Sequence, residues 1–280
     1  MTELSLLRIL LLSSLAIAPL GVHRHFLPVA PRARAAAHGI ALACAAVGLF
    51  TAAPIATIGW LLFTAGSFGL FLWTTPLSLR TPAGMAACVP FLFSNVAAVW
   101  LVAGTNDLHL LGYGPAFSAY AALHGNVLGW ILVGALAILV ERGGPARNVY
   151  FAAVLVCFAS FLLVALGIDQ LHALEPIGVV GLSIAIPLAQ LTFLRSVSSR
   201  DRGAFALGAI SVAGLALTMT LAWCNELGVP ALPEIGGVRA MVVVHGALNA
   251  LVVGPAFLAA VARDAPRAAD GQRSATSQPL

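Results

Sequence analysis

The chain has 280 residues, of which 60% are hydrophobic and 9% are charged, with a formal net charge of +4. A soluble core of this length could not bury so much apolar surface, so the composition indicates a polytopic protein whose partner is the lipid bilayer. The basic residues lie between hydrophobic segments, as topology signals do, and we expect no nucleic-acid binding. Four cysteines lie in or beside apolar runs without C-x-x-C spacing, which argues against a metal knuckle or a disulfide framework.

Apolar runs long enough to cross a bilayer predict an all-α fold with nine transmembrane helices. We expect these helices at 4–22, 36–54, 55–74, 84–104, 116–140, 148–167, 177–194, 204–224 and 238–262. The division at Pro54 is the weakest, because two spans meet there with almost no loop. The transmembrane domain is expected to cover 1–263, and the polar segment 264–280 is expected to be a disordered cytoplasmic tail.

The first span has one feature of a cleaved signal peptide, because Ala16-Ile17-Ala18 resembles a cleavage site. Pro19 follows this site directly, however, and Glu3 leaves the start of the chain poor in positive charge. We therefore expect the segment to be retained as a helix.

Arginine is distributed unevenly between the two sets of connections. All fourteen basic residues are Arg, and twelve of them fall in the loops 21–35, 75–83, 141–147 and 195–203 and after the last predicted span, from Arg263 onward. The opposite connections, 105–115, 168–176 and 225–237, contain acidic residues and no Arg. Because cytoplasmic loops carry the basic excess, we expect a multi-pass protein of the cell membrane with its N-terminus outside and its C-terminus in the cytoplasm.

Several polar side chains fall inside the predicted spans, where an unpartnered polar group is costly and a functional role is the default hypothesis. His245 and Asn249 are one helical turn apart and share a face of the last span. At 1.5 Å per residue, His124 and His245 lie about 12 and about 10 Å below the outer ends of their helices, which predicts a common layer. The residues that we expect to bind a ligand or relay protons are His124, His245, Asn249, Asn126, Asn95, Tyr120 and Arg239. Hydrogen bonding between helices is the alternative role for the same residues.

The outer connections carry a second polar set, which would form an acidic vestibule that favours cations. This set consists of Asp107, His109, Asp169, His172, Glu175, Glu226 and Glu234. Each residue alone is equally well explained as a solvated loop residue. Arg239 is the only Arg beside an outer loop, which suggests a partner such as Glu226, Glu234 or an anionic ligand group. His38, in contrast, is expected near the cytoplasmic surface.

The segment R-A-M-V-V-V-H-G-A-L-N-A, residues 239–250, with Gly254 in the same helix, resembles the last helix of the YndJ-like integral membrane proteins. The resemblance implies a membrane location and a polar site at His245 and Asn249, and the family is sometimes labelled a transporter. Family members carry a His-rich aromatic stretch in a middle helix. The corresponding segment here, Tyr120-Ala-Ala-Leu-His124-Gly-Asn126, has one His and lacks the aromatic neighbours.

Three functions are compatible with these features. The first is binding or transport of a small solute or cation, or of a proton-linked solute, through an outward-facing polar pocket. The second is a redox role, in which His124 and His245 hold a b-type haem, or copper with Met241 as a soft ligand. The third is a structural or assembly subunit whose polar residues only join helices. The sequence contains no common hydrolase or prenyltransferase motif, so it assigns neither an enzymatic reaction nor a cofactor, and it shows no metal-binding cluster.

Overall fold

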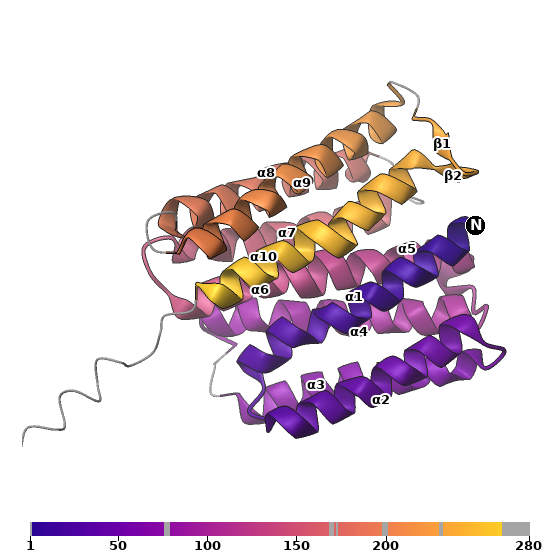
Figure 1. Cartoon of the computed structure of the whole chain (residues 1–280), viewed down its shortest axis with the longest axis horizontal. Helices are drawn as coiled ribbons and strands as arrows, with labels where there is room; N and C mark the ends of the chain where they lie inside the picture. Colours follow the sequence, from indigo (N-terminus) through magenta and orange to yellow (C-terminus); the bar gives the residue numbers. More distant parts are fainter. Residues whose placement is uncertain are drawn as a thin grey trace, which may run out of the picture.

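The computed structural model describes residues 2–75, 79–167, 171, 173–197, 201–229 and 232–264. Within these residues, nine helices are long and apolar enough to cross a membrane, which confirms the predicted all-α class and the number of spans. The spans lie roughly parallel to one another, and the N-terminus and the end of the last span lie at opposite ends of the bundle (Figure 1). The predicted tail beyond Asp264 lies outside the described residues.

Six of the spans are single α-helices, and three are composite. The single helices are α1 Glu3–Phe26, α2 Pro31–Phe50, α4 Pro82–Thr105, α7 Arg147–Gly167, α8 Leu174–Val197 and α9 Arg202–Leu227. The third span joins a 3-10 turn, Pro54–Thr57, to α3 Ile58–Thr74. The fifth joins α5 Pro115–His124, a π-helical segment Gly125–Leu132 and α6 Val133–Arg142. The last joins two π-helical segments, Met241–Gly246 and Asn249–Val253, to α10 Gly254–Arg263. Outside the spans are a 3-10 turn, Leu110–Gly112, and two short strands, β1 Glu234–Ile235 and β2 Val238–Arg239.

Two helix ends near proline residues differ from the predicted ones. The loop predicted over 21–35 is mostly helical, because α1 continues to Phe26 and α2 already begins at Pro31. Proline suits the first turn of a helix, where its missing N–H has no partner to lose. The predicted junction at Pro54 was also misplaced: α2 ends at Phe50, and a short connection precedes the 3-10 turn.

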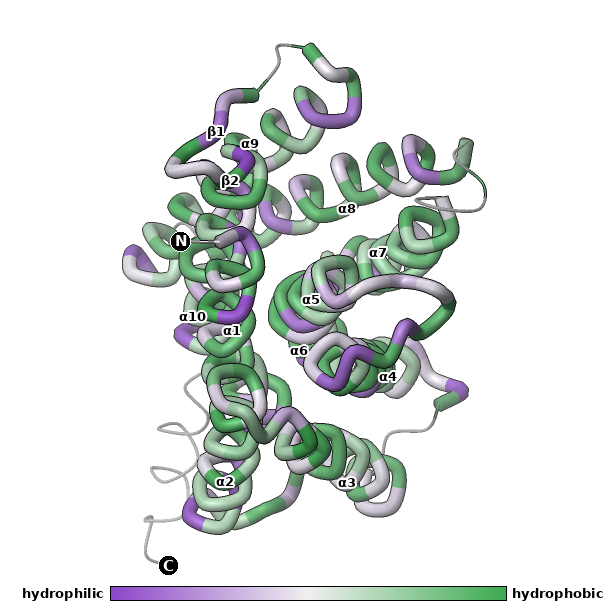
Figure 2. Tube along the Cα trace, turned by 90° about the vertical axis from the view of Figure 1, so that its right-hand side faces the viewer, coloured by the Kyte–Doolittle hydropathy of each residue, from purple (hydrophilic) through white to green (hydrophobic). Residues whose placement is uncertain are grey.

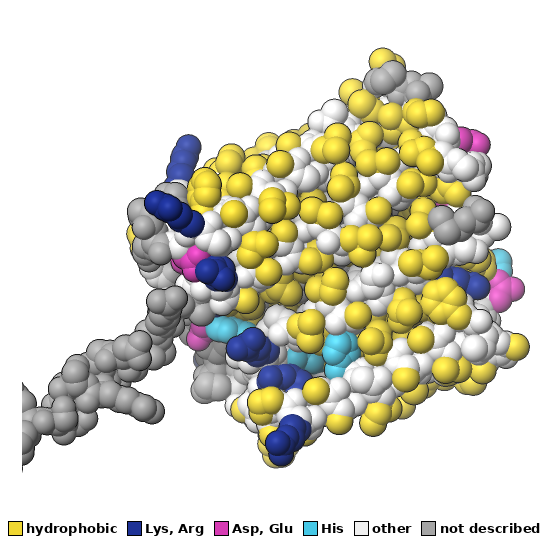
Figure 3. Space-filling model, in the orientation of Figure 1, with side chains coloured by type: hydrophobic (Ala, Val, Ile, Leu, Met, Phe, Trp, Pro, Cys, Tyr) yellow, Lys and Arg dark blue, Asp and Glu magenta, His cyan; other side chains and the backbone are white. Residues whose placement is uncertain are grey.

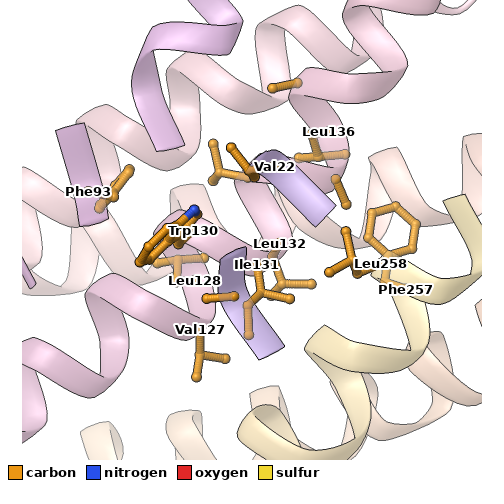
Figure 4. Packing of buried hydrophobic residues seen from close by; sticks show 14 of the residues in the cluster. Val22, Phe93, Val127, Leu128, Trp130, Ile131, Leu132, Leu136, Phe257 and Leu258 are labelled. Atoms are coloured by element: carbon orange, nitrogen blue, oxygen red, sulfur yellow. The ribbon is translucent and has the colours of Figure 1, made fainter. Parts of the chain in front are cut away.

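The fifth span lies at the centre of the bundle. Its π-helical segment is buried along its whole length, and Trp130 and Ile131 are fully enclosed. Side chains from α1, α4 and the last span surround it, among them Val22, Phe93 and Leu258 (Figure 4). This arrangement makes the fifth span the element against which the other spans of the core pack.

The helix α1 crosses close to this central span (Figures 1 and 2). A Cβ atom at Gly134 would lie 2.4 Å from Cγ2 of Val22, so a residue without a side chain is needed where α1 meets α6. Small residues at helix crossings allow close backbone approach in membranes, where dispersion contacts drive helix association. The position of α1 therefore depends on a glycine in the central span.

The outer surface of the bundle is apolar, as expected for a surface that faces lipid. Large hydrophobic side chains are exposed along the helices, including Trp73 at 89%, Ile40 at 69% and Leu62 at 67%. Figure 3 shows hydrophobic side chains over most of the visible face, with Arg side chains gathered mainly at the end opposite the N-terminus. Such a surface is stable only in a bilayer or a detergent micelle.

Polar contacts join the spans at this Arg-rich end. Asp201 caps the N-terminus of α9 by accepting hydrogen bonds from the backbone of Gly203 and Ala204, and it also pairs with Arg263 at 2.8 Å. His25 pairs with Glu141 at 2.9 Å. The Arg-rich ends of α1, α6, α9 and α10 are thus held by charged groups. The sidedness of the protein in the membrane stays a prediction from the Arg distribution.

We expect Gly129→Ala to destabilise the protein by about 1–3 kcal/mol, because the added methyl group overpacks the core. Its Cβ would lie 2.0 Å from Cγ of Phe93, a side chain that is only 3% exposed and has little room to move. Thermal unfolding in detergent measures the effect. Gly66→Ala in α3 is the matched control, because its Cβ would meet no atom within 4 Å. Equal melting temperatures for the two variants would contradict this view of the core.

A second prediction concerns acid and the Asp201–Arg263 pair. The hydrogen bond from Arg263 is the main reason that the pKa of Asp201 is below its ordinary value. The pair therefore contributes stability at neutral pH, and this contribution is lost as the pH falls through the lowered pKa. Asp201→Asn keeps a capping oxygen but removes the charge. We expect its melting temperature to be lower than wild type at neutral pH and to converge with wild type in acid. A difference that does not change with pH would refute this role of the carboxylate.

Candidate functional site

Three polar side chains meet at the N-terminal end of the bundle. Arg239 of β2 contacts the Glu3 carboxylate with two nitrogens, Nη2 to Oε1 at 3.2 Å and Nε to Oε2 at 3.4 Å. The Tyr120 hydroxyl of α5 donates to Glu3 Oε1 at 2.5 Å and accepts from Arg239 Nη2 at 3.2 Å. We call these residues the outer triad. It joins α1, α5 and the strand that precedes the last span.

A tight hairpin places Arg239 in this triad. Gly236 and Gly237 have φ values of +59° and +76°, which favour glycine and turn the chain between β1 and β2. The hydrogen bond to Glu3 raises the pKa of the Arg239 guanidinium above its ordinary value, so Arg239 stays cationic. Because Glu3 neutralises this charge, the triad as a whole has little net charge.

Arg239 pairs with neither of the two glutamates that were suggested as its partners. Glu234 stands opposite Arg239 in the hairpin, yet the ion pair forms with Glu3, at the far end of the sequence. Sequence reasoning missed Glu3 because its only visible effect was on the charge of the first segment. Nothing in the order of residues signals that the first and last spans lie side by side.

His124 and His245 lie next to each other, with their ring centroids 6.3 Å apart and their planes at 33°. His124 Nδ1 is 2.9 Å from the carbonyl oxygen of Tyr120, and His245 Nδ1 is 2.9 Å from the carbonyl oxygen of Thr218. A carbonyl oxygen only accepts, so each Nδ1 carries the proton. In the neutral form, each Nε2 then has an unshared electron pair. Neither Nε2 atom has a hydrogen-bond partner in the part of the chain that the structure describes.

Both histidines lie where their helices depart from α geometry. His124 is the last residue of α5 and directly precedes the π-helical segment Gly125–Leu132. His245 belongs to the π-helical segment Met241–Gly246. Such segments are rare and are often found at functional sites, where they re-aim side chains. His124 is exposed on the protein and His245 is half-buried, so the pair is open on the side of His124.

Thr218 and Asn249 lie next to His245. The Thr218 hydroxyl is 3.2 Å from Asn249 Oδ1 and 3.1 Å from the carbonyl oxygen of Leu215, both of which are acceptors. Thr218 also supplies the carbonyl that orients His245. Thr218 was not predicted, because the sequence gives no sign of which of the two threonines in this span, Thr218 or Thr220, faces a neighbouring helix.

The other predicted intramembrane residues bond elsewhere. Asn95 donates to the carbonyls of Phe91 and, at 3.4 Å, Thr64, so it faces α3. Asn126 is buried and donates to the carbonyl of Ala122 at 2.8 Å. No hydrogen bond within the described residues joins either asparagine to the histidine pair.

The predicted vestibule is only partly described. Asp169 and His172 lie outside the described residues. Asp107 and His109 pair with each other at 3.2 Å and are largely exposed. Glu175 lies in the first turn of α8, Glu226 is half-buried near the end of α9, and Glu234 is exposed on β1. The acidic vestibule as a whole therefore stays a prediction.

His23 and His38 lie on the neighbouring helices α1 and α2, and the early start of α2 places His38 about two turns inside its helix, farther from the helix end than expected. His38 Nε2 donates to the carbonyl of Leu15 at 3.1 Å. This carbonyl lacks its helical partner because Pro19, four residues later, has no N–H. His23 is 1% exposed, and its ring lies among those of Phe63, Phe91 and Trp130. Aromatic rings thus enclose His23, whose Nε2 has no hydrogen-bond partner among the described residues, whereas His38 is half-buried.

We expect Glu3→Gln and Arg239→Gln to show a coupling energy of up to about 1 kcal/mol in a double-mutant cycle, since Arg239 is 59% exposed and solvent weakens the pair. The cycle compares the unfolding free energies, measured in detergent, of the wild type, the two single variants and the double variant. Glu234→Gln is the matched control, and we expect no coupling between it and Arg239→Gln. Coupling to Glu234 instead of Glu3 would overturn the assigned pairing.

Comparison with known proteins agrees with the resemblance seen in the last helix and extends it over most of the chain. No curated protein and no solved structure matches the chain. The sequence model of the YndJ-like proteins matches residues 8–253, which include most of α1, the histidine pair and Asn249. The chain belongs to the YndJ-like family of proteins.

Proposed function

We propose that the protein binds a small cation or a proton-linked solute in an outward-facing polar pocket built on His124 and His245, and carries it across the membrane. The observation that carries this proposal is the adjacency of two imidazoles whose Nδ1 atoms are bonded to backbone carbonyls and whose Nε2 atoms have no hydrogen-bond partner among the described residues. Both Nε2 atoms are thus free to meet a ligand, at a pair that is exposed on the side of His124.

The chemistry of the pair favours a ligand that offers positive charge or protons. Two neutral imidazoles present two unshared electron pairs, and Asn249 adds a carboxamide beside His245. These electron pairs would repel an anion. A proton, a metal cation or a protonated amine is attracted to them.

The outer triad supports an entrance at the N-terminal end. Tyr120 connects the outer triad to the histidine pair, since its hydroxyl joins Glu3 and Arg239 while its carbonyl orients His124. A ligand that disturbs the triad therefore also affects the backbone contact of a histidine. The predicted sidedness, with the N-terminus outside, would make this entrance face the exterior.

The test is uptake into proteoliposomes that contain a pH-sensitive dye, with a panel of inorganic cations and protonated amines. We expect His124→Ala and His245→Ala each to lower the uptake of the transported solute by at least about tenfold, which corresponds to about 1.4 kcal/mol of lost interaction. His109→Ala, on the exposed outer loop, is the matched control and should keep wild-type uptake. Melting temperature and gel filtration verify that each variant is folded. Wild-type uptake of every solute by folded His245→Ala would overturn the proposal.

A further inference from the structure

The histidine pair has the arrangement of two ligands prepared for one metal ion. Histidines that bind metals usually donate the remaining ring N–H to a carboxylate or a backbone carbonyl, which fixes the tautomer and aims the other nitrogen at the ion. His124 and His245 both do this through Nδ1. The carbonyls that hold them belong to α5 and α9, so two separate helices set the directions of the two rings.

The separation of the rings suits a shared ion. Two imidazole nitrogens that each lie about 2.0–2.1 Å from one metal ion put their ring centres roughly 6 Å apart when the ion lies between them. The observed centroid distance is 6.3 Å. The separation of the ring centres is therefore compatible with one ion between the two rings.

The number of ligands narrows the class of ion. No group of three or more His, Cys, Asp and Glu side chains that could hold a metal occurs among the described residues. Zinc sites normally use three or four protein ligands, and magnesium and calcium prefer oxygen. Two nitrogens in line suit a monovalent d10 ion such as Cu(I), which is stable with two ligands. A single positive charge also costs less to bury than a double one, because the desolvation cost rises with the square of the charge.

We infer that His124 and His245 form a two-coordinate site for a monovalent soft metal cation of the Cu(I) class. This inference rests on the pocket described under the proposed function and names the kind of cation that the pocket takes. A haem iron could use the same two ligands but also needs a flat space for the macrocycle. A Soret band in the titration described below distinguishes a haem from a bare ion.

The test is anaerobic titration of the purified full-length protein with Cu(I), in competition with a chromogenic Cu(I) chelator. We expect one tightly bound ion per chain, and an X-ray absorption spectrum of two-coordinate Cu(I) with nitrogen neighbours. His124→Ala and His245→Ala should each weaken binding by at least about tenfold, the scale expected when one of few ligands is lost. His109→Ala, on the exposed loop, should bind as wild type.

Several results would overturn the inference. These are wild-type Cu(I) affinity in folded His124→Ala and His245→Ala, a spectrum with sulfur neighbours, tighter binding of Zn²⁺ than of Cu(I), or a Soret band that depends on both histidines after haem is added. The outcome is separable from that of the uptake assay. Loss of Cu(I) binding in the variants together with unchanged uptake would refute transport through the pocket and leave the metal site standing. If the wild type does not bind Cu(I) but the variants lose uptake of another solute, the metal site is refuted and transport through the pocket stands.

Discussion

The hydrocarbon interior of this bundle offers its imidazole groups few partners besides the backbone, and the arrangement of the polar residues follows from that shortage. His124, His245 and His38 each bond a backbone carbonyl. In water such bonds would compete with solvent and would orient a ring only weakly. Inside an apolar bundle a polar group without a partner is expensive, so each bond fixes both the tautomer and the direction of its ring. The backbone thus determines which nitrogen remains available for chemistry.

The same constraint has different results at the two sets of histidines. In the first set, His38 bonds the carbonyl that Pro19 leaves without a helical partner, and aromatic rings surround His23. In the second set, π-helical segments bring His124 and His245 together, and the side of His124 stays exposed. A histidine that aromatic rings enclose contributes mainly to packing, whereas a pair that is exposed on one side can meet a ligand. This contrast is the reason for assigning the proposed binding function to His124 and His245.

Hydropathy alone was sufficient for the number of spans, because the length of an apolar run in a bilayer protein is set by the thickness of the hydrocarbon. It was less informative at the ends of helices, where Pro31 and the residues up to Phe26 extended two spans beyond their apolar centres. The early start of α2 also places His38 about two turns inside its helix instead of near the helix end.

Site residues could be predicted only where polarity within a span was itself unusual. His124, His245 and Asn249 stood out for that reason, and the structure brings His124 and His245 side by side and joins Asn249 to their neighbour Thr218. Depth along a helix follows from the sequence, but the direction of a side chain depends on helix packing. Asn95 and Asn126, at similar depths, therefore turned out to bond elsewhere. Glu3 could not be found, because its role depends on a contact between the two ends of the chain.

That contact also has a consequence for the order of assembly. Glu3 meets Tyr120 across 117 residues and Arg239 across 236 residues of sequence. A membrane protein is inserted from its N-terminus as it is synthesised, so α1 enters the bilayer long before either partner exists. During that time the carboxylate of Glu3 can rely only on water at the membrane surface. The outer triad and the histidine pair can close only after the last span arrives, which makes the candidate site one of the latest parts of the protein to form, and one that a truncated chain would lack.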